Sequence, residues 1–362
     1  DVSLSGTIAL DNHVMQISAN DSVWTGSFYL SGNGAALNMQ AKVSLSGTWT
    51  VDGDITIDGT GQTLELSESA QIYITDGSTL TLRNILLEGL SGTQLQGLGD
   101  DSRVVLDNMA ILQAGDVSFD TGSILFENQV DLVGGVGCGE QVTYSFSYDS
   151  DQTSTIDSNS NLRIGRGIRF EIGNDDWAEE VQPLEFTDWT SVLHLDESTL
   201  RIVDQGLELK CGRMRVSSSS ILEVDTTYGV TLGNGVENND FMIEIEGDAR
   251  LSINDGIVYY NNMAQEDRIV FIGDDATLRI SYDDGFTALR TVLLKNGTLS
   301  FPTQDYLATM GTAIIDQDHV RHVHDVPYSS HVVQGQFQSG LGYLFIDDGF
   351  VMVECGQTIE AL

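Results

Sequence analysis

Basic residues are scarce in this chain of 362 residues: 16 Lys and Arg stand against 54 Asp and Glu, and the formal net charge is −38. Binding to a nucleic-acid backbone requires a surface rich in Lys and Arg, so nucleic-acid binding is excluded as a main role. Anionic membrane surfaces are disfavoured for the same reason. Because like charges repel, association between copies needs apolar or strand contacts, screening salt or bound cations. We expect no cofactor, with a divalent cation such as calcium as the alternative.

Proline, long apolar runs and helical periodicity are also scarce. The chain has 3 Pro, and no apolar run approaches the length that spans a bilayer, so we expect no membrane insertion. No sustained i, i+3, i+4, i+7 pattern predicts a long helix, whereas strict alternation, as in Phe241–Glu246, is frequent. The 38 Gly, with Asp and Ser between apolar runs, are typical of many short strands joined by turns.

Cysteine is the third scarce residue type. Cys138, Cys211 and Cys355 are each followed by Gly and lack the paired spacing of a zinc site or a redox pair. We interpret them as small buried side chains, with an intermolecular bridge as the alternative. Few Lys, many Ser, Thr, Asn and Gly and a strongly acidic balance together favour an exported protein, so we expect an extracellular or cell-surface location.

A short phrase recurs along the chain: a small or acidic residue, Ser or Thr, and then an alternating apolar pair, as in Asp76-Gly77-Ser78-Thr79-Leu80-Thr81-Leu82. The first apolar residues of its copies lie at positions 80, 105, 124, 162, 200, 222, 251, 278 and 299. The steps between them run from 19 to 38 residues and centre in the twenties, which is the period of a solenoid coil. Each copy is too short to bury its own apolar face, so stacked neighbours supply the core.

The repeat predicts an all-β fold, a right-handed parallel β-helix (β-solenoid) with strands stacked roughly 4.8 Å apart. We expect an irregular N-terminal cap or first coil over residues 1–50, the β-helix body over 51–301, and a C-terminal cap or assembly segment of β-strands over 302–362. The 38-residue steps after 124 and 162 predict a skipped coil or projecting loops. Two strand-like runs flank Asp347-Asp348-Gly349, which predicts a hairpin.

The repeat texture of residues 51–301 resembles that of secreted β-helix surface and fibre proteins, a broad class that includes adhesin passengers, phage fibre and tailspike modules and pectin-acting enzymes. The pectin hydrolases of this class combine an Asp pair with Asn-Thr-Asp, Gly-His-Gly and Arg-Ile-Lys motifs. This chain has Asp pairs, such as Asp100-Asp101, without the three companions, and we interpret the pairs as turn features. The lyases of the class place calcium beside a basic residue, and Arg163, Arg166 and Arg169 form the one basic cluster near an expected loop at 174–180.

The densest group of metal-ligand residue types lies at positions 319–324, in the run His-Val-Arg-His-Val-His. On a strand, His322 and His324 would face the same side and could share a metal ion. Solvated histidines in a loop, or histidines bonded to backbone, are the alternative.

We predict a non-enzymatic extracellular structural protein that self-assembles with copies of itself into a filament, fibre or surface layer, with adhesion as a further role. The mechanism would be strand addition or end-to-end stacking of coils. The residues expected at the contacts, unless they are ordinary capping core, are Leu4, Ile8 and Leu10 at one end and Phe345, Phe350, Val351 and Val353 at the other.

The alternative function is that of a carbohydrate-active β-helix enzyme, a polysaccharide lyase or hydrolase, or of a glycan-binding module whose partners are surface glycans. It predicts a groove in which exposed aromatic side chains, Trp177 and Trp189, lie beside carboxylates. Packing of a loop onto the body is the other interpretation of these two Trp residues.

Overall fold

The computed structural model describes residues 6–18, 22–135, 142–173, 182–203, 206–226, 228–233, 241–246, 248–255, 258–260, 268–280, 286–288, 291–301 and short strands beyond them, with side chains up to Ser252 and at Val258. These residues form 37 strands and no helix. The chain divides into two compact units, Asp1–Leu184 (unit 1) and Glu185–Leu362 (unit 2).

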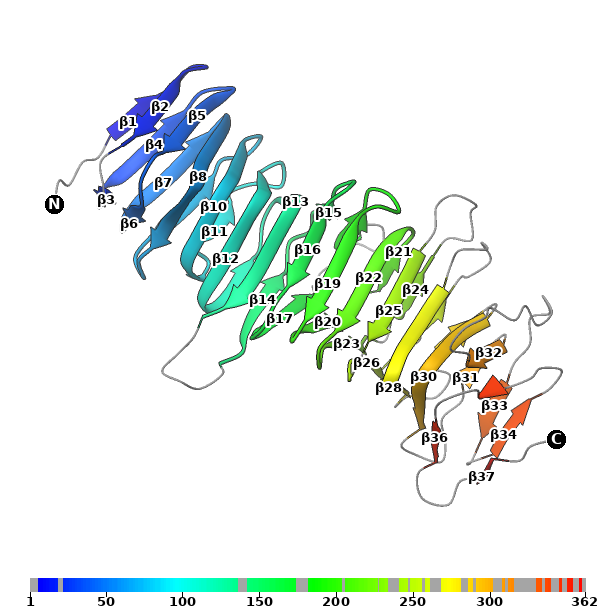
Figure 1. Cartoon of the computed structure of the whole chain (residues 1–362). Coiled ribbons are helices and arrows are strands. Elements are labelled where there is room, and N and C mark those ends of the chain that lie inside the picture. Colours follow the sequence, from blue (N-terminus) through cyan, green and yellow to red (C-terminus); the bar gives the residue numbers. More distant parts are fainter. Residues whose placement is uncertain are drawn as a thin grey trace. The chain divides into compact units, whose positions relative to one another are not determined.

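Nearly every strand pairs in parallel with a strand one turn away in the sequence (Figure 1). This arrangement confirms the prediction of an all-β, parallel β-solenoid.

Unit 1 presents three faces, defined by which strands pair. The first face contains β1 (Gly6–Ala9), β4 (Ser27–Ser31), β7 (Thr48–Asp52), β9 (Gln71–Ile74) and β11 (Leu95–Gly97). The second face contains β2 (Val14–Ile17), β5 (Ala35–Met39), the first halves of β8 (Asp54–Leu66), β10 (Thr79–Gly92), β12 (Arg103–Phe119) and β13 (Ser123–Gly134), and β15 (Ser154–Ile156). The third face contains β3 (Ser22–Trp24), β6 (Val43–Leu45), the later parts of β8, β10, β12 and β13, and β16 (Asn161–Ile164).

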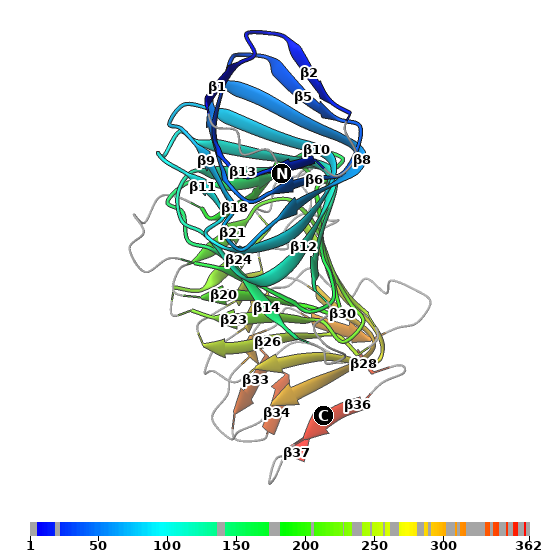
Figure 2. The same cartoon turned by 90° about the vertical axis from the view of Figure 1, so that its left-hand side faces the viewer.

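The last strands of unit 1 are β14 (Tyr144–Tyr148), which pairs with the end of β12, and β17 (Ile168–Ile172), which pairs with β14. Figure 2 shows β1 and β2 on different sides of the first turn. Strand β18 (Leu184–Phe186) spans the boundary between the units.

Unit 2 repeats the three-stack plan. One stack contains β21 (Leu207–Leu209), β24 (Val230–Leu232), β27 (Val258–Tyr260), β29 (Phe286–Ala288) and β31 (Ala308–Thr309). A second contains β19 (Val192–Asp196), β22 (Gly212–Ser217), β25 (Phe241–Glu246), the first parts of β28 (Arg268–Ile280) and β30 (Thr291–Phe301), then β32 (Thr312–Ile315) and β35 (Phe345–Ile346). The third contains β20 (Thr199–Val203), β23 (Ile221–Asp225), β26 (Arg250–Asp255), the later parts of β28 and β30, and β36 (Phe350–Val353).

A small separate sheet completes the described strands: β33 (Ser330–Val333) pairs antiparallel with β34 (Gln336–Ser339), which pairs in parallel with β37 (Thr358–Ile359).

Alternation along each strand builds the core. In β10, Leu80, Leu82 and Leu87 are fully buried, whereas Thr81 and Arg83 point outward. Successive side chains of a strand point to opposite sides, so the inward rows of Leu, Ile, Val and Phe stack from turn to turn and exclude water. Aromatic residues join these rows: the rings of Phe119 and Tyr148 stack at 5.9 Å.

The Ser of the recurring phrase has a structural role. Ser78, Ser160 and Ser220 are buried, and each hydroxyl oxygen accepts a hydrogen bond from a backbone N–H one turn earlier, at 2.8, 2.8 and 3.1 Å. A small hydroxyl fits the tight turn and satisfies a backbone donor that would otherwise be buried unpaired.

One position of the expected repeat was wrong, and one of its long steps has another explanation than a skipped coil. The register pairs Leu80 with Val104 and Val104 with Ile124, so the inward residue of that copy is Val104, one position before the expected 105. Val105 points outward but is itself buried, so both positions are apolar. The step from 124 to 162 needs no skipped coil, because Ile124 lies on the second face and Leu162 on the third.

The expected hairpin around Asp347-Asp348-Gly349 was also wrong. Strand β35 pairs in parallel with β32, and β36 pairs in parallel with β30, so the two runs extend different stacks. The antiparallel pair in this segment is β33 with β34. At the other end, β1 to β7 already stack as regular turns within residues 6–52.

Candidate functional site

Among the described residues, a hollow lies at the corner between the second and third faces of unit 1. There β10 turns with a single residue, Asn84, whereas β8 uses the three residues from Gly59 to Gly61, as the register shows. Strand β12 also turns with one residue, Asn108, but β13 uses two, Asn128 and Gln129. Two tight corners are thus flanked by wider corners on both sides, and a hollow of about 490 Å³ results.

The tight corners depend on a left-handed backbone. Asn84 and Asn108 have φ values of 52° and 49°, and Asn128 has 57°. Asn adopts this region more readily than other residues with a side chain. At the wider corner of β8, a Cβ on Gly59 would lie 2.8 Å from the carbonyl oxygen of Asn84, so only Gly allows β8 and β10 to approach there.

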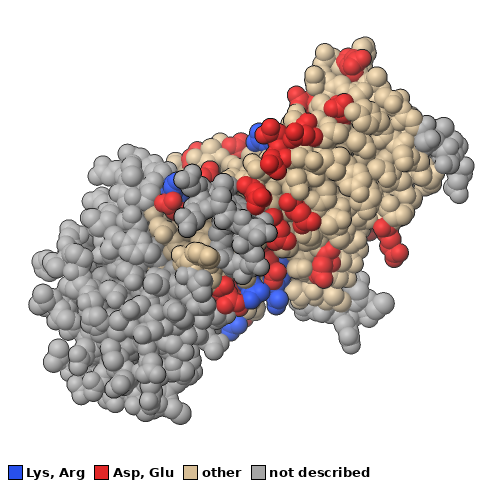
Figure 3. Space-filling model, turned by 180° about the vertical axis from the view of Figure 1, so that it is seen from behind, with Lys and Arg blue, Asp and Glu red and all other residues tan. Residues whose placement is uncertain are grey.

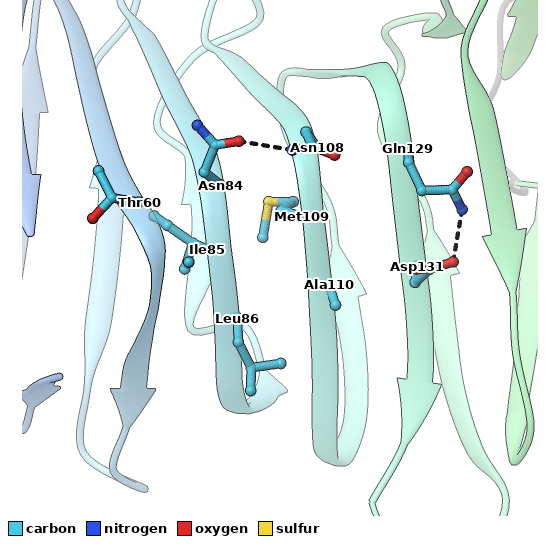
Figure 4. Close-up of a pocket in the computed structure, with 10 residues that line it drawn as sticks. Thr60, Asn84, Ile85, Leu86, Asn108, Met109, Ala110, Gln129 and Asp131 are labelled. Atoms are coloured by element: carbon cyan, nitrogen blue, oxygen red, sulfur yellow. Dashed lines mark hydrogen bonds between the residues drawn. The ribbon is translucent and has the colours of Figure 1, made fainter. Parts of the chain in front are cut away.

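The floor of the hollow is apolar and its rim is polar (Figure 4). Leu86, Met109 and Ala110 form the floor, and the Leu86 side chain is 37% exposed. The rim consists of the Asn84 and Asn108 carboxamides, Thr60 on one side and Gln129 with Asp131 on the other.

Hydrogen bonds order the rim. Asn108 Nδ2 donates to Asn84 Oδ1 at 2.7 Å, and Asn84 Nδ2 donates to Asp58 Oδ1 at 3.3 Å. On the far wall Gln129 Nε2 donates to Asp131 Oδ1 at 2.8 Å. Because each amide orients the next, the rim is held in place before any ligand arrives.

A row of charged side chains runs along the second face beside this corner. The register aligns Asp58, Arg83, Asp107 and Glu127. Arg83 Nε donates to Asp107 Oδ2 at 2.5 Å and Asn128 Nδ2 donates to Asp107 Oδ1 at 2.6 Å. Each oxygen of the buried Asp107 thus accepts a hydrogen bond, which holds this carboxylate in place.

Glu127, next in the row, has a raised pKa because partial burial disfavours its charged form and the carboxylates of Asp107 and Asp157 repel it, against the opposing attraction of Arg83 and Arg103.

Acidic residues dominate the visible surface: Figure 3 shows that Asp and Glu far outnumber Lys and Arg on the side that it presents. The described residues contain no group of three or more His, Cys, Asp or Glu that could hold a metal ion.

Of the predicted glycan-binding residues, Trp189 lies at the surface of unit 2, where its side chain is 48% exposed. The guanidinium carbon of Arg213 sits 4.9 Å from its ring centre. The neighbouring carboxylate of Asp188 accepts hydrogen bonds from Thr190. Trp177 lies outside the described residues, so the predicted pair stays a prediction.

The predicted assembly residues fall at the ends of the stacks. Ile8 and Leu10 lie in and just after β1; Ile8 is half-buried and Leu10 is buried. Phe345 belongs to β35, and Phe350, Val351 and Val353 belong to β36. Leu4 lies outside the described residues.

The remaining predicted residues divide between placed and unplaced positions. His322 and His324 lie outside the described residues, as do Cys138 and Cys355. Cys211 is buried and forms no disulfide; its thiol donates a hydrogen bond to Phe186 O at 3.3 Å, and burial raises the pKa of the thiol. Two arginines of the basic cluster lie near carboxylates. Arg163 Nη1 is 3.8 Å from Asp131 Oδ1, and Arg169 Nη1 is 3.8 Å from Glu171 Oε1.

Sequence reasoning missed the hollow, although a signal for it exists. A charged residue followed by Asn comes directly after the apolar pair, as Arg83-Asn84, Asp107-Asn108 and Glu127-Asn128. Asn at a fixed offset after a strand indicates a corner with a left-handed residue.

No protein-family model, curated protein or solved structure matches the chain. None of the described segments forms a helix long and apolar enough to cross a membrane.

Proposed function

We propose that the protein is a non-enzymatic, extracellular structural β-solenoid whose copies associate end to end into filaments, fibres or a surface layer. The observation that carries this proposal is the first turn of unit 1. Strands β1, β2 and β3 pair with β4, β5 and β6, and among the described strands they have no neighbour on their other side. We call these three strands the N-terminal edge.

The N-terminal edge offers backbone groups in the pattern that another strand requires. Ala36 N donates to His13 O at 3.1 Å and Gln40 N donates to Ile17 O at 2.8 Å. Backbone groups alternate in direction along a strand, so the N–H groups of Val14 and Gln16 point away from β5. A free row of donors and acceptors at a sheet edge is a template for a further strand.

The core is also less covered at this edge. Ile8, Met15 and Trp24 are half-buried, whereas Leu30, Leu37 and Leu45, their partners in the next turn, are fully buried. A copy stacked on this turn would bury the same inward rows. Apolar burial contributes roughly 25 cal/mol per Å², so stacking adds to the strand hydrogen bonds.

Charge sets the conditions for this association. With a net charge of −38, copies repel one another at low ionic strength. Salt shortens the screening length to about 8 Å at physiological strength, so assembly is expected to increase with added salt.

Sedimentation velocity over a range of protein and salt concentrations tests the proposal. We expect large assemblies that grow with both. Gln16→Pro removes one outward N–H of the N-terminal edge and should prevent growth, whereas Gln16→Ala keeps the N–H and should assemble normally. A monomer at every concentration and salt condition, or equal assembly of the two variants, would refute the proposal.

A further inference from the structure

The hollow at the corner of unit 1 has no part in end-to-end association, because it lies on the side of the stack. Its volume of about 490 Å³ falls in the range of roughly 300–1,000 Å³ typical of small-molecule sites. Strands β8 and β13, which form its walls, are three strand spacings apart, or roughly 14 Å. The hollow is therefore long enough for more than one small ring.

The lining selects an uncharged ligand. Asp131 is the one charged residue of the ten that line the hollow. Its Oδ1 accepts a hydrogen bond from Gln129 and lies 3.8 Å from Arg163 Nη1, which offsets its charge. The lining contains no Lys, Arg or His to bind a phosphate ester or a carboxylated ligand, and its one carboxylate already has an amide and a guanidinium beside it.

The polar rim is suited to hydroxyl groups. Carboxamides both donate and accept, as hydroxyls do, and the four uncharged polar side chains of the lining, Asn84, Asn108, Gln129 and Thr60, surround the floor. Thr60 Oγ1 donates to Met39 O and Gln129 Oε1 accepts from Asn161, so the second amide N–H of Gln129 is the group that it offers a ligand. Asn108 Oδ1 accepts no hydrogen bond from any described residue and can accept one from a ligand hydroxyl. Leu86 and Ala110 at the floor can pack against the C–H face of a ring.

A peptide strand fits this site less well. On either side of the corner residues Asn84 and Asn108, β10 and β12 are already paired with each other and with β8 and β13 in the parallel ladder. The hollow lies at a corner along the side of the stack and not at a sheet edge, so it offers a peptide no strand pairing.

We propose that this hollow binds a short, neutral oligosaccharide segment, with its sugar rings across Leu86 and Ala110 and its hydroxyls on the Asn84, Asn108 and Gln129 amides. Trp189 is not among the residues that line the hollow, and the proposed contacts require no metal ion. It gives the solenoid a lateral attachment point to glycans.

Ligand-detected NMR and titration calorimetry with neutral trisaccharides of glucose, xylose, mannose and N-acetylglucosamine test the proposal, on the 362-residue chain at a concentration where sedimentation shows a monomer. At least one of these trisaccharides is expected to bind, and trigalacturonate, which is anionic, is not. Failure of all four neutral probes to bind at millimolar concentration, or tighter binding of trigalacturonate, would overturn the proposal.

Substitutions at the hollow test whether the trisaccharide binds there. Leu86→Glu places a charge and bulk on the floor and should weaken binding at least tenfold, and Gln129→Ala should weaken it several-fold. Leu98→Glu is the matched control, because Leu98 is 56% exposed in unit 1 and does not line the hollow. Thermal unfolding checks that each variant is folded. Unchanged binding by folded Leu86→Glu, or equal loss in Leu98→Glu, would contradict the assignment.

Discussion

The left-handed corner at Asn108 yields a prediction whose sign depends on the backbone alone. Asn108 has φ of 49° and donates one hydrogen bond of 2.7 Å to Asn84 Oδ1. Ala has the same Cβ as Asn but lacks the local hydrogen bonding that favours Asn in the left-handed region, at a cost of about 1 kcal/mol. Loss of an exposed hydrogen bond adds about 0.5 kcal/mol.

Asn108→Ala should therefore destabilise the protein by about 1.5 kcal/mol, whereas Asn108→Gly loses the same hydrogen bond but adopts the corner freely and should cost less than about 0.5 kcal/mol. Ala110, two residues further along β12 on the straight strand, provides the control. There Gly is worse than Ala, so Ala110→Gly should cost about 0.5–1 kcal/mol.

Urea denaturation followed by circular dichroism measures these differences as shifts in the unfolding midpoint at constant slope. The reasoning is refuted if Asn108→Gly is at least as destabilising as Asn108→Ala. In other words, the order of stability of Ala and Gly at position 108 must be the reverse of their order at position 110.

Three further predictions concern the core and the charged row of unit 1. Leu87→Ala, at a fully buried position, should lower the free energy of unfolding in urea by about 3 kcal/mol. Leu86→Ala, on the exposed floor of the hollow, should lower it by less than about 1 kcal/mol, and equal losses would contradict the assignment of Leu87 to the inward side of the strand. Asp107→Asn should cost about 2 kcal/mol because it weakens the 2.5 Å pair with Arg83, and a neutral effect would show that the pair adds nothing. The raised pKa of Glu127 means that the folded state binds its proton more tightly than the unfolded state, so the stability of the protein rises as pH falls through that pKa. Glu127→Gln should therefore be more stable than the parent protein at pH 7 and lose this advantage near pH 4. A stability difference that does not change with pH would argue against the charge effect.

The sequence was a good guide to the class of fold, because strand alternation and a period in the twenties leave few other solutions. It was a poor guide to register where both sides of a strand are apolar, as at Val104 and Val105. A slip of one residue reverses every side chain of a strand, and the hydrophobic pattern alone does not separate the two choices there.

The recurring phrase also changed face between Ile124 and Leu162, and this is invisible to a one-dimensional repeat. Any of the three faces can carry the same alternation, so the spacing reports the turn length only while the phrase stays on one face. The spacing alone therefore predicts a skipped coil or projecting loops, whereas the change of face accounts for the step without a skipped coil.

The candidate site was hidden for a different reason. The hollow depends on corner lengths in four successive turns, from the three residues of β8 to the single residue of β12. Those lengths are differences between neighbouring strands and become apparent only once the strands are paired. The recurring Asn at 84, 108 and 128 pointed to the corners but not to their unequal widths.

Electron microscopy of the purified 362-residue chain at physiological salt tests the central claim most directly. The proposed end-to-end association predicts regular filaments that shorten or disappear at low ionic strength, where the charge of −38 is least screened. Dispersed single particles of one size under both conditions would contradict it.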